Sequence, residues 1–554
     1  MEIGIMPGIE DNSGQSFSTT VGLLYVFNLI VGTGALALPK AFQTAGWALG
    51  TLLLLISGFV SYICATFVVE AMSVTNAVLK SNGEFQNRIH SLEDEDTDEA
   101  EDSPEERYDE EARNFEITKK VELSEMSLIL LGRIGVIGTY LILTLYLFGD
   151  LAIYSTTVPK SLMNVLCESP NATHITSDLP CYSGSFENFS RMTVYRICVV
   201  IFAAFCLPLV LIGMARTKYI QLATTVSRWT AFSLMIILAS MQLIQEGPQA
   251  TPPAMDFHGF GSLFGVAIYA FMCHHSIPGL IIPIKNKNYF NYKLIFVYGI
   301  IFVFYCTLSV TGSFAFHNVQ DVYTLNFLHD DKSDFFYSIV DYFLALFPVF
   351  TLTSSYIIVA ITLSNNLRVL VTMFRPSSES TGVENEALLN SGSDTEDAIE
   401  LRPSSNSSEN YSVFGDQFSH YVIPVIAIFF PTILSFFNDN VLFLASVTGS
   451  YPGVGVQFVI PSCLVLGARK FVKNKFQKIP KTLKSPFCHD IWPILTLIWA
   501  GFTVINVTIH LFHFGASFLK TPVFGGSSVL MALVFFEFLS PTALTIPFAL
   551  LVQF

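Results

Sequence analysis

Residues 28–39 read Asn-Leu-Ile-Val-Gly-Thr-Gly-Ala-Leu-Ala-Leu-Pro, and they lie in an apolar run long enough to cross a bilayer. Gly32 and Gly34 flank Thr33 there, and a glycine costs a helix interior about 1 kcal/mol relative to alanine. Small residues that let two helices pack closely would explain this composition. A helix interrupted at mid-membrane explains it equally well.

A second apolar run is interrupted in a similar way. Residues 269–279 read Tyr-Ala-Phe-Met-Cys-His-His-Ser-Ile-Pro-Gly, which makes a poor continuous helix. Such residues persist at mid-bilayer only where protein or a water-filled cavity satisfies the backbone. Two histidines that merely pack between helices are the simpler alternative.

The two interruptions fall in the first and sixth apolar runs, which are corresponding positions in two five-helix halves of inverted topology. Matching interruptions of this kind point to the binding site of a transporter. Half-helix N-termini and bare amides would bind a substrate carboxylate, and exposed carbonyls would bind a cation.

The composition assigns the whole chain to the membrane. Of its 554 residues 52% are hydrophobic and only 13% are charged, whereas soluble domains are about a quarter charged. This excludes a secreted domain, a nucleic-acid binder and a soluble enzyme. We expect an all-α polytopic protein with spans near 18–44, 47–76, 127–158, 194–214, 219–243, 259–284, 291–315, 335–365, 418–437, 440–466 and 490–511.

Charge indicates how these spans are threaded. The net charge of −15 comes from residues 93–111, with thirteen acids, and residues 376–412, with eight, and such polar segments do not form a packed core. Sixteen short-loop Lys and Arg residues lie on one side of the predicted bilayer and five on the other, so the first side is cytosolic. The predicted order is a cytosolic N-terminus (1–17), two spans (18–76), an acidic cytosolic loop (77–126), six spans (127–365), an acidic Ser-rich cytosolic loop (366–417), three spans (418–511) and a tail (512–554) with a twelfth apolar stretch.

The predicted exoplasmic loop 159–193 agrees with this topology. It holds two glycosylation sequons, at Asn171 and Asn188. It also holds Cys167 and Cys181, the two of nine cysteines that fall in an exoplasmic loop, where oxidation can occur. We predict that both asparagines are glycosylated and that the two cysteines form a disulfide.

Several stretches resemble the amino acid/auxin permease family. Residues 27–47, which contain the first interruption, are similar to its first-helix signature, and Tyr146–Tyr154, Phe271–Pro278 and Thr448–Pro461 add to the match. The resemblance covers about residues 15 to 511 and implies a LeuT-type 5+5 inverted-repeat fold with eleven transmembrane helices, a twelfth lying outside it. By position it assigns substrate contacts to Gly32, Thr33, Gly34, Phe271, Cys273, His274, His275 and Ser276.

The resemblance also implies a sodium site. Sodium-coupled members of that family use an Asn on helix one and a Thr on helix eight, and Asn28 and Thr353 stand at these positions. Both carry neutral oxygens suited to a hard cation. A Thr353 hydroxyl that bonds its own helix backbone is the alternative.

Charges within the spans suggest a second coupling ion. Asp150 is the deepest acid, and it is either a proton-coupling carboxylate or the partner of Arg228 in a structural ion pair. Glu70 lies near the cytosolic end of its span and is expected to reach the headgroup region. Sodium and protons both remain open as the coupling ion, with the Asn28–Thr353 match slightly favouring sodium. No other cofactor or metal is expected.

The function predicted from these observations is secondary active transport of amino acids or related small zwitterions by alternating access. An amino-acid sensor or signalling scaffold on the same fold is the alternative. No enzyme is expected, because the chain lacks a Walker loop, a His-Glu-x-x-His motif and a paired-cysteine metal site.

The Ser-rich loop suggests an address within the cell. Glu384–Leu389 has the spacing of an acidic dileucine signal and Tyr411–Phe414 that of a tyrosine-based one, both read by clathrin adaptors as extended peptides. An endolysosomal membrane is therefore expected at least part of the time. Chance occurrence of such short patterns would leave the plasma membrane as the address.

Overall fold

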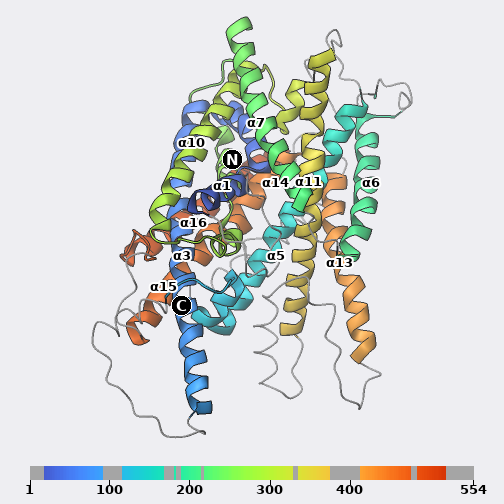
Figure 1. Ribbon diagram of the computed structural model, residues 1–554. Helices are drawn as coiled ribbons and strands as arrows, with labels where there is room; N and C mark the ends of the chain where they lie inside the picture. The colour runs from blue at the N-terminus through green and yellow to red at the C-terminus, as the bar shows by residue number, and fades with distance from the viewer. Residues whose placement is uncertain are drawn as a thin grey trace.

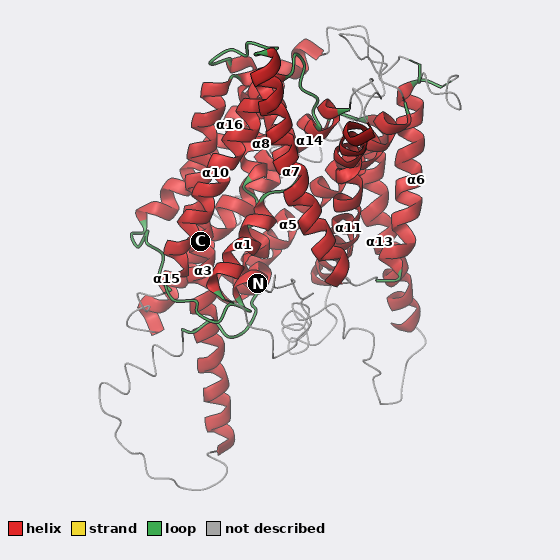
Figure 2. Cartoon of the chain, turned by 45° about the horizontal axis from the view of Figure 1, so that its top comes forward, coloured by secondary structure: helices red, strands yellow, loops and turns green. Residues whose placement is uncertain are grey.

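The computed structural model describes residues 18–91, 115–167, 180–181, 189–213, 218–328, 335–374, 412–475 and 483–518. In these residues the regular structure is helical, apart from one bridge between Pro180 and Ser190 (Figure 2). Nine of the described helices are long and apolar enough to cross a membrane, and a bent helix pair makes a tenth span. The predicted all-α polytopic class is confirmed.

The helices follow the predicted spans in order along the chain. They are α1 (Thr19–Ile30), α2 (Thr33–Ala45), α3 (Trp47–Ser91), α5 (Leu123–Leu166), α6 (Arg191–Leu211), α7 (Lys218–Glu246), α8 (Phe260–Ala270), α9 (Ile277–Ile281), α10 (Phe290–Ala315), α11 (Phe335–Phe374), α13 (Ser412–Phe437), α14 (Val441–Thr448), α15 (Ile460–Lys475) and α16 (Ile491–Phe518). Short 3₁₀ turns are η1 (Phe257–Gly259), η2 (His274–Ser276) and η3 (Tyr323–Phe327). Two wide π turns, η5 (Gly449–Gly453) and η6 (Gly455–Val459), join α14 to α15.

Side-chain caps begin several of these helices. Ser18 accepts a hydrogen bond from the Val21 amide at the start of α1, and Ser190 accepts one from the Thr193 amide at the start of α6. Asn440 does the same for α14. Each cap satisfies an N–H group that has no partner inside its helix, and so it fixes where the helix begins.

Two groups of helices lie side by side in Figure 1. In one group α5, α6, α11 and α13 pack against one another, and in the other α2, α3, α8 and α10 do so, with α1 against α10. α14 lies between the groups and touches both α5 and α8, while α7 packs on α10 and α11. The two interrupted spans therefore belong to one group, and α14 contacts both groups.

The outer surface is apolar where lipid contact is expected. Large hydrophobic side chains are exposed on α6, α10 and α16, including Ile201, Phe205, Val303, Ile498 and Ile505. Contiguous exposed apolar surface is unstable in water and is typical of proteins whose solvent is the bilayer.

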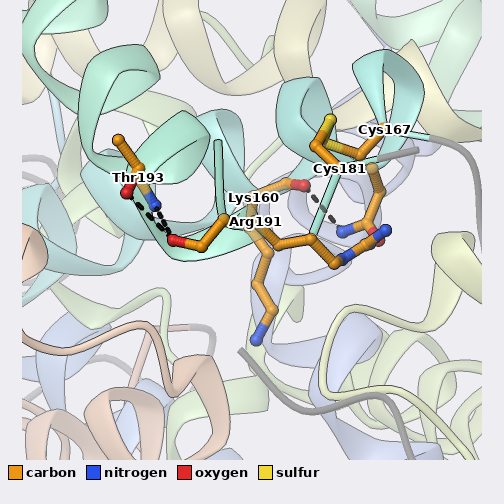
Figure 3. The surroundings of a disulfide bond; sticks show 7 residues. Lys160, Cys167, Cys181, Arg191 and Thr193 are labelled. Atoms are coloured by element: carbon orange, nitrogen blue, oxygen red, sulfur yellow. Dashed lines mark hydrogen bonds between the residues drawn. A yellow bond between two sulfur atoms is a disulfide. The ribbon is translucent and has the colours of Figure 1, made fainter. Parts of the chain in front are cut away.

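A disulfide joins Cys167, directly after α5, to Cys181 (Figure 3). This is the pair that the sequence predicts. Nearby, the Arg191 guanidinium donates to the Asn164 side-chain oxygen at 2.6 Å and ties the end of α5 to the start of α6. The disulfide and this contact close the same end of the molecule.

Helices extend beyond the predicted spans in three places. α3 continues beyond residue 76 to Ser91, α11 continues to Phe374, and α13 begins at Ser412. The spans were predicted from apolar length, but helical hydrogen bonding continues through polar residues beyond the apolar run. Several predictions lie outside the described residues: 1–17, the loop residues 92–114 and 375–411, the sequons at Asn171 and Asn188, the motif Glu384–Leu389, Tyr411 and the twelfth stretch after 518.

The prediction for Glu70 is wrong. Its side chain is fully buried and pairs with Arg469 of α15, whose Nε lies 2.8 Å from Oε1. The Ser485 amide donates to Oε2 at 2.8 Å as well. The carboxylate is held by two segments about 400 residues further along the chain, and local sequence does not reveal such partners.

Candidate functional site

The first span breaks at Gly32. α1 and α2 meet there at an angle of 53°, and Gly32 is the N-cap residue of α2 without a side-chain cap. A Cβ built on Gly32 would meet only the Ile30 carbonyl oxygen, at 4.0 Å, so the space beside this residue is open. In the first turn of α2 the Ala35 N–H donates to the Gly32 carbonyl at 3.1 Å, while the N–H groups before it precede any intrahelical acceptor. This end of a helix favours a carboxylate.

The sixth span breaks directly after Ala270, where α8 ends. The chain then passes through Phe271–Cys273 and η2 before α9 begins at Ile277. Tyr305 of α10 holds the two breaks together, because its hydroxyl lies 2.9 Å from the carbonyl oxygens of both Ile30 and Ala270. These are the last residues of α1 and α8, whose carbonyls lack intrahelical partners.

A chain of hydrogen bonds connects the first break to the opposite helix group. The Thr33 hydroxyl lies 3.0 Å from the Tyr269 hydroxyl, and Tyr269 donates to Asp150 Oδ1 at 2.8 Å. Thr33 begins α2, Tyr269 lies in the last turn of α8, and Asp150 lies on α5. Asp150 is 5% exposed. A proton gained or lost at this carboxyl would change the contact between the two helix groups.

Of the predicted substrate contacts, some lie at the breaks and others are packed elsewhere. The Phe271 ring is fully buried and stacks on Tyr298, with ring centroids 6.0 Å apart, while the Cys273 thiol lies 3.3 Å from the Tyr298 hydroxyl. His274 donates from Nε2 to the Ser61 carbonyl at 3.1 Å. These three side chains are therefore directed toward α3 and α10.

His275 has a different environment. Its ring lies 5.4 Å from that of Tyr146, one turn before Asp150 on α5, and its Nδ1 is buried with no hydrogen-bond partner in the described part of the chain. Ser276 is half-buried at the end of η2. The structure thus brings Thr33, His275 and Asp150 to the boundary where the two helix groups meet.

Gly34 contacts protein where ligand contact was predicted. A Cβ built on it would lie 2.6 Å from Cα of Ala270, so the start of α2 packs directly on the end of α8. Its φ is also not in the positive range that favours glycine. The close-packing explanation of this glycine is the one that the geometry supports.

The predicted sodium ligands lie in a different arrangement from the one expected. The Asn28 amide donates to the Thr225 hydroxyl at 3.1 Å, and the Asn28 carbonyl accepts from the Arg228 guanidinium at 2.6 Å. The Thr353 hydroxyl bonds the Val349 carbonyl of its own helix. A cavity of about 10 Å³ beside Asn28 and Arg228 is otherwise lined by Phe27, Val31, Trp229, Phe232 and Phe304.

The ion pair suggested for Asp150 and Arg228 is absent among the described contacts. Asp150 instead accepts from Tyr269, and Arg228 donates to the Asn28 backbone. Sequence reasoning missed Tyr269 and Tyr305 as site residues. A tyrosine in an apolar helix carries no signal of its own, and only the meeting of α1, α8 and α10 gives these hydroxyls their role.

The chain is similar to known families along most of its length. A profile of the family described as "Transmembrane amino acid transporter protein" matches residues 15–509. A protein named Transmembrane protein 104 homolog from Caenorhabditis elegans is 50% identical over 511 residues, which is 91% of this chain and 98% of that protein. Transmembrane protein 104 of Mus musculus is 35% identical over 535 residues, 91% of this chain and 99% of that protein. The Homo sapiens protein of the same name is 34% identical over 533 residues, with 91% and 99% coverage.

Proposed function

The chain belongs to the transmembrane amino acid transporter family, and we propose that it moves amino acids or related small zwitterions across a membrane by alternating access. Membership confirms the resemblance seen in the sequence and indicates a transporter rather than an enzyme. The observation that carries the proposal is the meeting of two broken spans, with the open N-terminus of α2 beside the end of α8.

The helix grouping supports a LeuT-type arrangement. The breaks fall in the first and sixth spans, and the first, second, sixth and seventh spans pack as one group against the third, fourth, eighth and ninth. In such folds one group rocks against the other around a site at the membrane midplane. The hydrogen bonds from Thr33 through Tyr269 to Asp150 cross this boundary and would have to break or reform in each cycle.

We propose protons, and not sodium, as the coupling ion. Arg228 already brings a positive charge to the Asn28 carbonyl, and a sodium ion bound there would meet like-charge repulsion in a low dielectric. The adjacent cavity is mostly aromatic and aliphatic, which is a poor ligand set for a hard cation. Asp150 is buried, contacts the broken spans through Tyr269 and has no basic partner among the described contacts.

Uptake by liposomes that contain the purified full-length chain tests this proposal. A panel of amino acids is offered under an imposed pH gradient, an imposed sodium gradient, or neither. We expect accumulation of at least one amino acid driven by the pH gradient, and no effect of replacing sodium by choline. Binding without uptake would instead identify a sensor, and the absence of both would contradict the proposal.

Asp150→Asn preserves size and removes the titratable group, so any remaining transport should be independent of pH. Asp341→Asn is the matched control, because Asp341 is also a buried acid but lies on α11, outside the contacts described for the breaks. Equal pH dependence of the wild type and Asp150→Asn would remove Asp150 from the coupling mechanism.

A further inference from the structure

The two π turns that join α14 to α15 carry a glutamine deep in the molecule. Wide turns of this kind are rare and are often found at functional sites. Gln457 in η6 is fully buried, yet neither its Nε2 nor its Oε1 has a hydrogen-bond partner among the residues that the structure describes. Leaving a buried polar group unpaired destabilises a protein, so an amide with both ends free requires an explanation.

The packing of η5 and η6 shows which elements surround this residue. A Cβ on Gly449 would meet the Gly265 carbonyl oxygen and the Tyr269 Cβ, and a Cβ on Gly453 would come 3.2 Å from the methyl group of Met272, so η5 lies against the end of the sixth span. η6, which carries Gln457, packs against η2 of the same span and against α3, α5 and α16.

A second unpaired polar atom lies on the element that η6 contacts. Nδ1 of His275 in η2 is buried with no partner among the described residues, and its ring faces Tyr146 of α5. Hydrogen-bonding capacity without formal charge is therefore present on η2, where the sixth span is broken, and on η6, which packs against it.

We infer that Gln457 is a specificity-determining residue that binds the side chain of the substrate, and that the preferred amino acids carry an uncharged hydrogen-bonding side chain, a hydroxyl or a carboxamide. This inference rests on the proposed function. The N-terminus of α2 accounts for the carboxylate of a zwitterion, and Gln457 lies on a third element, η6, which packs against η2 of the broken sixth span. An amide donates and accepts at once, so it complements a hydroxyl or a second amide, and an apolar side chain would leave it unpaired.

The test measures binding to the purified full-length chain by the rise in its melting temperature, titrated with the isosteric pairs asparagine and leucine, and threonine and valine. We expect apparent affinity to be at least about tenfold higher for the polar member of each pair. Gln457→Leu should abolish this preference without lowering the melting temperature of the ligand-free protein, because it removes an unsatisfied group. Gln242→Leu, on α7 and half-buried, is the matched control and should keep the preference.

The outcomes separate this inference from the proposed function. If no amino acid of a full panel raises the melting temperature, the proposed function fails and the inference with it. If amino acids bind but the polar members have no advantage, or if Gln457→Leu retains the advantage, only the inference is overturned. Should Gln457→Leu fail to fold, Gln457→Glu replaces it: its carboxylate should shift preference toward amino acids with a cationic side chain, and an unchanged preference would overturn the inference.

Discussion

Two glycines that are two residues apart in one sequence motif have different surroundings. Gly32 has open space at its Cβ position, whereas a Cβ on Gly34 would lie 2.6 Å from Ala270 Cα. The atoms nearest to this Cβ are Cα, N and Cβ of Ala270, so no flexible side chain could move aside. Glycine thus leaves room for a ligand at position 32 and allows close helix packing at position 34.

We therefore predict opposite failures for Gly32→Ala and Gly34→Ala. Gly34→Ala should separate α2 from α8 and lower the melting temperature of the purified protein, with a loss in the 1–3 kcal/mol range typical of overpacking. Gly32→Ala should leave the melting temperature within a degree or two of wild type and weaken amino-acid binding. Equal melting temperatures for the two variants would contradict the packing role of Gly34.

The Thr353 and Asn28 side chains both bond to other groups of the protein. Since the Thr353 hydroxyl bonds its own helix, Thr353→Val should leave uptake and its ion dependence unchanged. Asn28→Ala should reduce uptake without changing its response to sodium, because the backbone carbonyl that binds Arg228 remains. A sodium-dependent wild type whose sodium affinity falls in either variant would reinstate sodium coupling.

Among the elements, α3 and α15 are joined by a charged cluster. Arg469 contacts both oxygens of Glu70, donates to the Phe487 carbonyl at 2.8 Å and lies over the Phe67 ring. The Ser485 amide and hydroxyl bind Glu70 and Thr66, so the segment before α16 is fastened to α3. This cluster lies in the part of the molecule that the charge count predicts to be cytosolic.

Removing one member of the Glu70–Arg469 pair should strongly destabilise the protein. Glu70→Gln removes the buried counter-ion of Arg469 and leaves only Asp490, which is 47% exposed and lies 3.4 Å from Nη1. We expect a loss toward the lower end of about 3–5 kcal/mol, seen as a large fall in melting temperature. The double variant Glu70→Gln/Arg469→Met should recover part of the lost stability.

Lys473→Ala provides the comparison for this pair. It breaks the exposed contact to Asp490, in which Lys473 and Asp490 are 70% and 47% exposed, and such pairs contribute about 0–1 kcal/mol. A Glu70→Gln protein as stable as Lys473→Ala would mean that the buried pair contributes little.

The disulfide and the two sequons predict which side of the molecule faces the oxidising compartment. Closing the loop between Cys167 and Cys181 contributes about 3 kcal/mol in the chain-entropy model. Peptide mapping without reduction should recover the two cysteines linked, and glycosidase should shift the wild-type band but not the Asn171→Gln/Asn188→Gln band. Two free thiols would contradict the predicted topology, whereas the buried free Cys198 should be unlinked in either case.

The cellular address is predicted from the Ser-rich loop. Leu388→Ala/Leu389→Ala should increase the fraction of protein labelled by surface biotinylation, because paired leucines fill apolar adaptor pockets. Tyr411→Ala should add little, since Ser412 begins α13 and the motif Tyr411–Phe414 therefore overlaps a helix where an extended peptide is required. Equal surface fractions for wild type and the dileucine variant would favour the plasma membrane.

The sequence alone determined the membrane class, the order of the helices and the place of both breaks. These depend on local properties: apolar length, which must match the bilayer, and glycine, proline and histidine residues that a continuous helix does not favour. The family followed from the same stretches, because residues 27–47 and 271–278 carry both the breaks and the resemblance.

The partners of the polar groups were decided only by the tertiary structure. Glu70 pairs with Arg469, Arg228 binds the Asn28 backbone, Asp150 accepts from Tyr269, and Tyr305 joins two helix ends. Apart from the contact of Tyr305 with Ala270, each of these links segments more than a hundred residues apart, so no local pattern encodes it. The depth of a charge and the direction of a hydroxyl depend on which helices meet, and that is fixed by packing of the whole chain.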